Sequence, residues 1–182
     1  MTAAFAPLNL AFLAFAAAVL LWARQRTRPG PPFPGPRPVG PAFKAWLVVI
    51  WLVGLILPLA ALVVDGVLGG SAAVRAALGW YLALFAAQVG AEIFVWKRWR
   101  SPVWVIVPCL FLPWRLFQVV MGLVSVETPP LSEAALWALL GLWLVNIGVH
   151  YSNIPNSLRW DYHPRDATFP ALPGPNPFRR GG

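Results

Sequence analysis

Residues that bind metals or catalyse reactions are scarce in this chain. Its 182 residues include one cysteine, two histidines and six acidic residues. The single cysteine, Cys109, excludes a disulfide within the chain. The sequence has no His/Cys/Asp/Glu cluster with metal-ligand spacing, no glycine-rich phosphate loop and no Ser/His/Asp set. We therefore expect a protein that is not an enzyme.

Charge is also scarce, whereas apolar residues dominate. Charged residues make up 11% of the chain and hydrophobic residues 59%. The net charge of +8 is concentrated in a few short segments, so it does not mark a nucleic-acid-binding face. This composition excludes an ordinary soluble core, and we expect no nucleic-acid partner.

Five long apolar runs alternate with loops along the chain. Each is close to the ~17 to 25 residues that a membrane-spanning helix needs. The runs cover roughly residues 7–23, 44–64, 72–96, 102–124 and 131–151. The pattern predicts an all-α, polytopic membrane protein in which residues 1–151 form a bundle of five transmembrane helices. The first run has no basic segment before it and no cleavage pattern, so we expect it to stay in the mature protein.

The Lys and Arg residues alternate between successive loops. None precedes the first run, five lie from Arg24 to Lys44, one follows the second run, three lie from Lys97 to Arg100, none lies between the fourth and fifth runs, and four lie from Arg159 to Arg180. The positive-inside rule then puts the N-terminus outside and the C-terminus inside. Basic inner loops facing anionic lipid headgroups are the usual explanation. We expect a multi-pass protein of a bacterial inner membrane or a photosynthetic membrane.

Two proline-rich segments lie on the predicted inner side. The first is the loop 24–43, and the second is the tail 152–182. Proline removes backbone donors and favours extended geometry, so both segments are expected to be stiff, polyproline-like straps without a core of their own.

Arg115 and Glu92 are two ionisable residues that fall within predicted helices, where charge is costly. Arg115 lies fifteen residues after Arg100, hence ~22 Å along a helix and past the bilayer midplane. Two interpretations stay open: its guanidinium stacks on an indole of the fifth helix, near Trp137 to Trp143, or it reaches the outer interface. Glu92 is expected to be an interfacial acid paired with Lys97 or Arg98.

Other polar residues give weaker indications. His150 is the one candidate ligand to the metal of a haem or chlorophyll, although a hydrogen bond to Asn146 or Asn153 is the commoner role for such a residue. Asp65 and Glu127 are expected to be solvated charges in outer loops. Prolines 58, 108 and 113 predict kinks.

Eleven tryptophans exceed what anchoring at membrane interfaces requires. Those near helix ends are expected to form interfacial belts: Trp22, Trp46, Trp80, Trp96, Trp99, Trp104 and Trp160. The deeper ones are Trp51, Trp114, Trp137 and Trp143. They could line an aromatic pocket for a planar hydrophobic ligand, or could serve helix packing alone.

Several short patterns are similar to those of one known family. Residues Arg28, Pro29, Pro31, Pro32, Gly40, Pro41 and Trp46 follow one another in the order of its Pro-rich entry to helix two. Leu84-Phe85-Ala86-Ala87-Gln88-Val89 matches a pattern of its third helix, and Asn146 and Asn153 match two asparagines seven residues apart in its fifth. Together with five helices, a long first inner loop and abundant Trp and Pro, roughly residues 20–153 resemble the tryptophan-rich sensory protein (translocator protein) family. Glu92, Val95 and His150 depart from the pattern.

This resemblance implies a non-enzymatic membrane protein that binds a tetrapyrrole or a sterol-like lipid in an intramembrane pocket, often as a dimer. The positions that would contact the ligand are Trp46, Trp51, Gln88, Glu92, Trp143 and Asn146, to which the argument from charge adds Arg115.

A second hypothesis is an accessory or scaffolding subunit of a large photosynthetic or respiratory membrane complex. The proline-rich loop and tail would then anchor it to other subunits, and a chlorophyll or carotenoid, as well as a porphyrin, becomes a conceivable cofactor. A transporter or channel is disfavoured because no line of ionisable or amide residues crosses the predicted bundle.

Overall fold

The computed structural model describes residues 2–26, 41–99, 102–125 and 127–157. These residues form helices joined by short connections, and no strand occurs among them. The helices are α1 (Thr2–Arg26), α2 (Pro41–Trp51), η1 (Leu52–Ile56), α3 (Leu57–Ala61), η2 (Leu62–Leu68), α4 (Ala72–Phe94), η3 (Val95–Trp99), η4 (Pro102–Val105), α5 (Ile106–Ser125) and α6 (Pro130–Ser157). The segments η1, η2 and η3 are π-helical, and η4 is a 3₁₀ turn.

The described residues contain five helical stretches long and apolar enough to span a membrane, as the sequence predicts. They are Ala6–Arg26, Lys44–Leu68, Ala72–Trp99, Val103–Val124 and Pro130–Tyr151. The second stretch runs through α2, η1, α3 and η2 without a break in the helix.

The helices extend beyond the apolar runs at several ends. Helix α1 continues through Arg24 to Arg26, where basic side chains are favourable next to the partial negative charge of a helix C-terminus. Helix α2 begins at Pro41, and proline suits a first helical position because its missing N–H has no intrahelical partner there. Of the two predicted straps, residues 27–40 and 158–182 lie outside the described residues.

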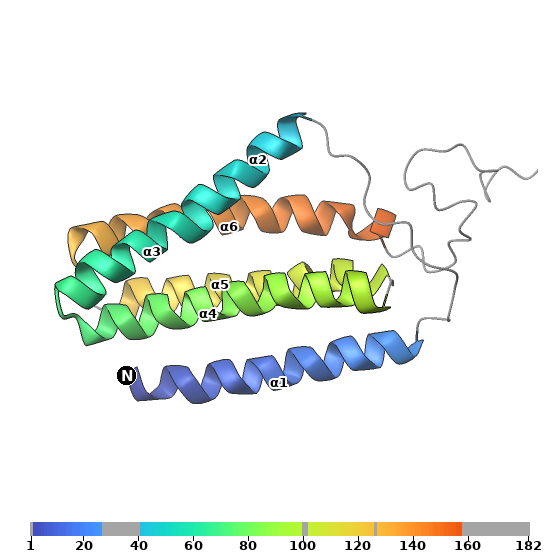
Figure 1. Cartoon of the computed structure of the whole chain (residues 1–182), viewed down its shortest axis with the longest axis horizontal. Coiled ribbons are helices and arrows are strands. Elements are labelled where there is room, and N and C mark those ends of the chain that lie inside the picture. The colour runs from blue at the N-terminus through green and yellow to red at the C-terminus, as the bar shows by residue number, and fades with distance from the viewer. Residues whose placement is uncertain (1, 27–40, 100–101, 126, 158–182) are drawn as a thin grey trace, which may run out of the picture.

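The helices run alternately up and down in an elongated bundle (Figure 1). Helix α5 packs between α4 and α6, and α1 packs on α4 and α5. The second stretch contacts α4 and α6 mainly through η1, α3 and η2, whereas α2 diverges from the bundle towards its free end (Figure 1). The end of the bundle near α2 therefore has a looser packing than the opposite end.

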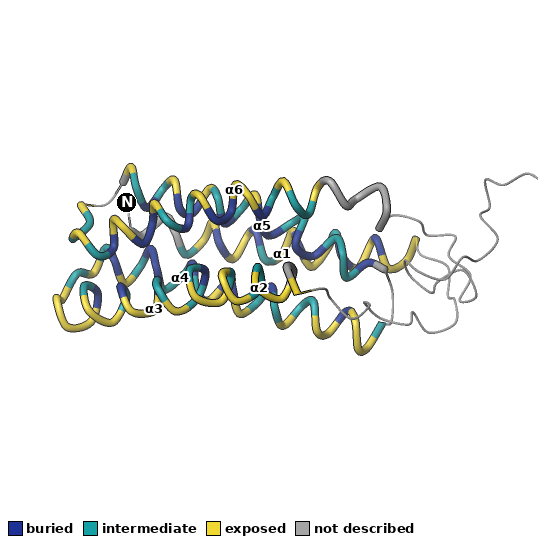
Figure 2. Tube along the Cα trace, turned by 90° about the horizontal axis from the view of Figure 1, so that it is seen from above, coloured by how far each residue is buried: buried dark blue, intermediate teal, exposed yellow. Residues whose placement is uncertain are grey.

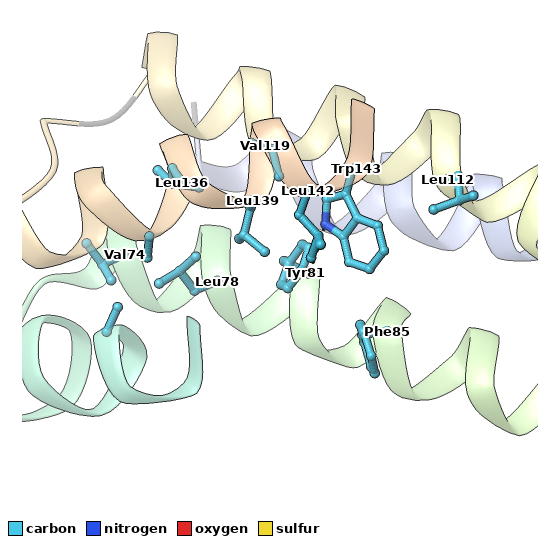
Figure 3. Packing of buried hydrophobic residues seen from close by; sticks show 12 residues of the cluster. Val74, Leu78, Tyr81, Phe85, Leu112, Val119, Leu136, Leu139, Leu142 and Trp143 are labelled. Atoms are coloured by element: carbon cyan, nitrogen blue, oxygen red, sulfur yellow. Dashed lines mark hydrogen bonds between the residues drawn. The ribbon is translucent and has the colours of Figure 1, made fainter. Parts of the chain in front are cut away.

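Two groups of buried apolar side chains hold the bundle together. The larger joins the second stretch, α4, α5 and α6 around residues such as Leu78, Leu139 and Trp143 (Figure 3). The smaller joins α1 to α4 and α5 around Phe12 and Phe111. The remaining apolar surface is large, and most of the described side chains of α2 are exposed (Figure 2). Only 17% of the most apolar part of the second stretch is buried. A helix that is apolar all round and little buried by protein is typical of one that faces lipid.

Tight packing at one end of the bundle depends on Asp65. Its Oδ2 atom accepts hydrogen bonds from the Ser132 backbone N–H (2.8 Å) and hydroxyl (2.6 Å) in the first turn of α6. The prediction that Asp65 is a solvated loop charge is therefore wrong, because the helix of the second stretch extends past Val64 and turns this carboxylate into a cap for another helix. Glu127, by contrast, is exposed in the connection before α6.

The turn that follows η2 has its own local cause. Gly70 has φ of 73°, a backbone conformation that glycine adopts without strain. The next residue, Ser71, caps α4 by accepting a hydrogen bond from the Val74 N–H at 3.3 Å.

Pro113 leaves one backbone carbonyl in α5 without its normal helical donor. A proline has no N–H, so the carbonyl of Cys109, four residues earlier, loses that hydrogen bond. The hydroxyl of Tyr151 in α6 donates to this carbonyl at 2.8 Å. A neighbouring helix thus satisfies the group that proline has freed, as is expected for proline inside a membrane helix.

Candidate ligand-binding site

One face of α4 carries the polar and aromatic residues from which the candidate site is built. Tyr81, Phe85, Gln88 and Glu92 follow one another at spacings of four, three and four residues, so they form a single stripe about 16 Å long. Tyr81, Phe85 and Gln88 are buried, and Glu92 is partly buried. This stripe faces α5, α6 and the second stretch.

Arg115 of α5 is buried opposite this stripe, with 1% of its surface exposed. Its Cζ atom lies 4.3 Å from the ring centroid of Phe85, 4.6 Å from that of Trp143 and 6.0 Å from that of Tyr81. Of the two interpretations left open by the sequence, the structure has the stacked guanidinium, in contact with the fifth-helix indole at 143. Three aromatic rings therefore surround a cation in the interior of the helical bundle.

The guanidinium is incompletely satisfied. Its Nε and Nη2 atoms are buried and have no hydrogen-bond partner. Buried donors without partners are rare in folded proteins, because each loses its bonds to water without replacement. Aromatic rings thus contact the guanidinium of Arg115, while its Nε and Nη2 donors have no hydrogen-bond acceptor.

Trp143, Tyr81 and Gly54 form a chain of hydrogen bonds that fixes the aromatic part of the site. The Trp143 indole N–H donates to the Tyr81 hydroxyl at 3.1 Å, and that hydroxyl donates to the Gly54 carbonyl at 2.8 Å. Pro58 has no N–H to give to this carbonyl four residues earlier, so the carbonyl is available. Figure 3 shows Trp143 reaching from α6 to the side of Tyr81.

Gly54 is required for this contact because α6 comes so close. A Cβ atom at position 54 would lie 3.1 Å from Cζ2 and 3.3 Å from Cη2 of Trp143, and 3.4 Å from Cδ2 of Leu142. The indole therefore packs directly against the backbone of η1, where the π-helical geometry also occurs.

Gln88 and Glu92 form a polar pair on α4, one to two turns beyond Phe85. The Gln88 Nε2 atom donates to Glu92 Oε1 at 2.6 Å, while Gln88 Oε1 is buried without a partner. The expected pairing of Glu92 with Lys97 or Arg98 does not occur in the described part of the chain. Glu92 instead lies close enough to Arg115 for their charges to interact, although no direct ion pair joins them within the described residues.

The second stretch and α6 complete the site. The Trp46 indole N–H donates to Asn146 Oδ1 at 3.2 Å, although Trp46 was expected to act as an interfacial anchor. The Trp51 ring meets Phe85 edge-on, with centroids 5.9 Å apart. Phe85 in turn lies 6.2 Å from Trp143.

The seven residues expected to contact a ligand fall into three groups: Trp51, Arg115 and Trp143 lie against Phe85, Gln88 pairs with Glu92, and Trp46 pairs with Asn146. Sequence reasoning missed Phe85 and Tyr81. Phe85 touches Trp51, Trp143 and Arg115, and Tyr81 ties α4 to η1 and α6. The signal that could have found them is their i, i+4 spacing and their register with Gln88 on one helical face.

The remaining candidates lie elsewhere. Trp137 is 57% exposed on the outside of α6. Trp114 belongs to a separate cluster in which its indole N–H donates to Asn9 Oδ1 at 2.9 Å, the acceptor that Gln118 Nε2 also uses. This cluster attaches α1 to α5 and does not touch Arg115.

His150 is partly buried on α6, and it has no hydrogen-bond partner within the described residues. Of its two expected partners, Asn146 accepts from Trp46 instead, and the side chain of Asn153 lies outside what the structure describes. The described part of the chain contains no group of three or more His, Cys, Asp and Glu side chains that could hold a metal ion. His150 is thus without companion ligands there.

The site combines several groups that can contact a ligand. It offers aromatic faces, a cation with two free donors, and an amide and a carboxylate on the same helix face. No nucleophile with a neighbouring base lies among these residues.

A family model described as a domain of unknown function (DUF7733) matches residues 2–159, a range that includes every described residue. No curated protein and no solved structure matches the chain.

Proposed function

The chain belongs to the DUF7733 family, and we propose that it is a multi-pass integral membrane protein that binds a planar hydrophobic ligand, without catalysing a reaction. The observation that carries this proposal is Arg115, fully buried among the rings of Phe85, Trp143 and Tyr81 with two N–H donors unpartnered. A cation kept at membrane depth by flat aromatic faces is costly to maintain and is typical of a functional site.

The membrane location is supported by the distribution of charge on the bundle. The ends of α1 and α4 and the start of α2 lie together at one end of the bundle (Figure 1). The five basic residues near these helix ends are Arg24, Arg26, Lys44, Lys97 and Arg98. The opposite end carries Arg75 together with the acids Asp65, Glu127 and Glu133. By the positive-inside rule the five-cation end is cytoplasmic, so the N-terminus lies outside and α6 ends inside.

This orientation is tested by labelling with a membrane-impermeant maleimide in a Cys109→Ser background. Leu68→Cys, on the outer side and 77% exposed, is expected to react in intact cells. Gln25→Cys, at the inner end of α1 and exposed, is expected to react only after the membrane is opened. The reverse pattern would refute the orientation.

The kind of ligand follows from the chemistry of these side chains. Trp51, Phe85, Trp143 and Tyr81 present ring faces and edges, which suit a flat apolar body. Helix α2 diverges from α4 and α6 on the side of Trp46 and Glu92, so this end is where we expect the ligand to enter (Figure 1). A tetrapyrrole fits these requirements, as does a sterol-like lipid.

The resemblance to the tryptophan-rich sensory protein family supports the same proposal. It points to Trp46, Trp51, Gln88, Glu92, Trp143 and Asn146. Of these, Trp51 and Trp143 lie against Phe85 beside Arg115, Gln88 pairs with Glu92, and Trp46 pairs with Asn146. Association with a second copy, as is common in that family, belongs to the proposal as well.

The accessory-subunit hypothesis rests on residues 27–40 and 158–182, which lie outside the described residues. No observation on the described residues favours it over the binding protein. We therefore do not pursue chlorophyll or carotenoid as cofactors, or His150 as their ligand.

The proposal is tested by titrating the purified protein in nanodiscs with protoporphyrin and following the shift of its main absorption band. Trp143→Phe is expected to weaken binding about 10-fold or more, as truncation of a buried aromatic anchor does. Trp137→Phe is the matched control, because it makes the same change six residues away on the exposed face of α6. Saturable binding that both variants retain would refute the site, and absence of saturable binding would refute a tetrapyrrole ligand.

A further inference from the structure

The two unpartnered nitrogens of Arg115 lie on one edge of its guanidinium group. The Nε–H bond and one Nη2–H bond of arginine point in nearly parallel directions in the plane of the group. This edge matches the two oxygens of a carboxylate, which it binds through two hydrogen bonds at once. The unsatisfied part of Arg115 is therefore a preformed half of a bidentate pair.

No acidic residue in the described part of the chain provides the carboxylate for this pair. Glu92 interacts with Arg115 through its charge, but its Oε1 atom is used by Gln88 and no ion pair to Arg115 forms. Asp65 is engaged with Ser132 at the outer end of the bundle. Glu127 and Glu133 also lie at that end and are exposed.

An empty edge of this kind is unfavourable at membrane depth. The guanidinium is 1% exposed, so water does not replace the missing acceptors, and ring faces do not accept hydrogen bonds from the edge of the group. A ligand that brings an acid group removes both the unpaired donors and the unbalanced charge.

We infer that the ligand is an acidic one: a planar hydrophobic molecule bearing a carboxylate that docks on the Nε/Nη2 edge of Arg115 while its apolar body lies against the aromatic rings. This inference rests on the proposed function and narrows it, because a neutral sterol-like ligand would leave Arg115 as it is. A tetrapyrrole with carboxylate side chains meets both requirements.

Glu92 then opposes the binding of an acidic ligand. Glu92 lies on the same face of α4 as Phe85, which contacts the guanidinium of Arg115, so an ionised Glu92 would stabilise Arg115 in the empty site and repel an incoming carboxylate. A conservative change to Glu92 should therefore strengthen binding of an acidic ligand, whereas a change at Arg115 should weaken it.

The test compares two probes with the same ring system, protoporphyrin and its uncharged dimethyl ester, by absorption titration in nanodiscs. The wild-type protein is expected to bind the diacid about 10- to 100-fold more tightly, the range for hydrogen bonds to a charged group. Arg115→Lys keeps the charge and loses the two-donor edge, so the preference for the diacid should fall at least several-fold. Glu92→Gln should strengthen binding of the diacid relative to binding of the ester, a change in preference that a purely structural role would not give.

The outcomes separate the inference from the proposed function. Equal binding of acid and ester, with the dependence on Trp143 intact, would overturn the inference and leave the binding site in place. A preference for the diacid that survives Arg115→Lys would also overturn it. If Arg115→Lys does not fold, the comparison of the two probes on the wild type and on Glu92→Gln still tests whether the ligand is acidic. Weaker binding of the diacid by Glu92→Gln would count against an acidic ligand. Failure of both probes to bind would refute the proposed tetrapyrrole function itself.

Discussion

Replacing Gly54 with alanine tests the central contact of the site, the packing of α6 against the backbone of η1. The added methyl would meet the Trp143 ring at 3.1 and 3.3 Å and a Leu142 methyl at 3.4 Å. The indole cannot simply rotate away, because its N–H is bonded to Tyr81 and Arg115 lies over its face. Overpacking of this kind destabilises by about 1–3 kcal/mol. The gain in helix propensity from glycine to alanine offsets roughly 0.5–1 kcal/mol of it.

The expected net loss is about 0.5–2 kcal/mol, or roughly 1–8 °C in the unfolding temperature of a protein of this size. It is measured by thermal unfolding in detergent, followed by intrinsic fluorescence. Gly141→Ala is the matched control: it lies on α6 two residues before Trp143, and its Cβ atom would have nothing within 4 Å. The reasoning would be refuted if Gly54→Ala were as stable as Gly141→Ala and bound protoporphyrin like the wild type.

Three further changes have distinct expected outcomes, the first two in the same unfolding assay and the third in a proteolysis assay. Tyr81→Phe leaves the Trp143 indole N–H and a backbone carbonyl without partners, so we expect a loss of about 1–3 kcal/mol in stability. Tyr151→Phe breaks one exposed hydrogen bond and should lower the stability by about 1 kcal/mol or less. Equal losses would contradict the role of the Tyr81 hydroxyl in joining the helices. Asp65→Ala removes the cap of α6 and should cost about 0.5–2 kcal/mol, and an unchanged stability would show that this cap does not matter. Asn9→Ala leaves two α5 donors unpaired and should loosen α1, seen as faster proteolysis within α1 than in the wild type; identical cleavage rates would speak against that role.

Much of the fold follows from the sequence because one physical rule dominates it. A bilayer requires about twenty apolar residues for each span, and the five runs stand out against the scarcity of charge. The depth argument put Arg115 either near Trp137 to Trp143 or at the outer interface, and in the structure Arg115 contacts Trp143. Helical rise and antiparallel order fix which levels face each other.

The details of the site depend on contacts that no local pattern carries. Phe85 has no polar atom to draw attention, yet it is the ring that touches Trp51, Trp143 and Arg115. The Tyr81 hydroxyl finds its acceptor 27 residues away in the chain, where Pro58 has freed a carbonyl. Such pairs are decided by how the helices rotate about their axes, which composition and periodicity do not specify.

Asp65 illustrates the same limit at a helix end. The apolar pattern ends at Val64, and the sequence therefore predicts a loop charge. The helix instead continues to Leu68 because tertiary contacts to α4 and α6 support it, and the carboxylate caps α6. Helix boundaries set by packing against a distant segment are not visible in the local sequence.

The most direct test of the central claim is to locate a bound ligand on the chain. A porphyrin carrying a photoreactive diazirine would be bound to the protein in nanodiscs, illuminated, and the labelled peptides identified by mass spectrometry. The account predicts labelling within residues 46–54, 81–92 and 143–146, suppressed by excess unmodified protoporphyrin and by Trp143→Phe. Labelling spread over exposed positions such as Trp137 and Leu144, and not suppressed by the competitor, would contradict it.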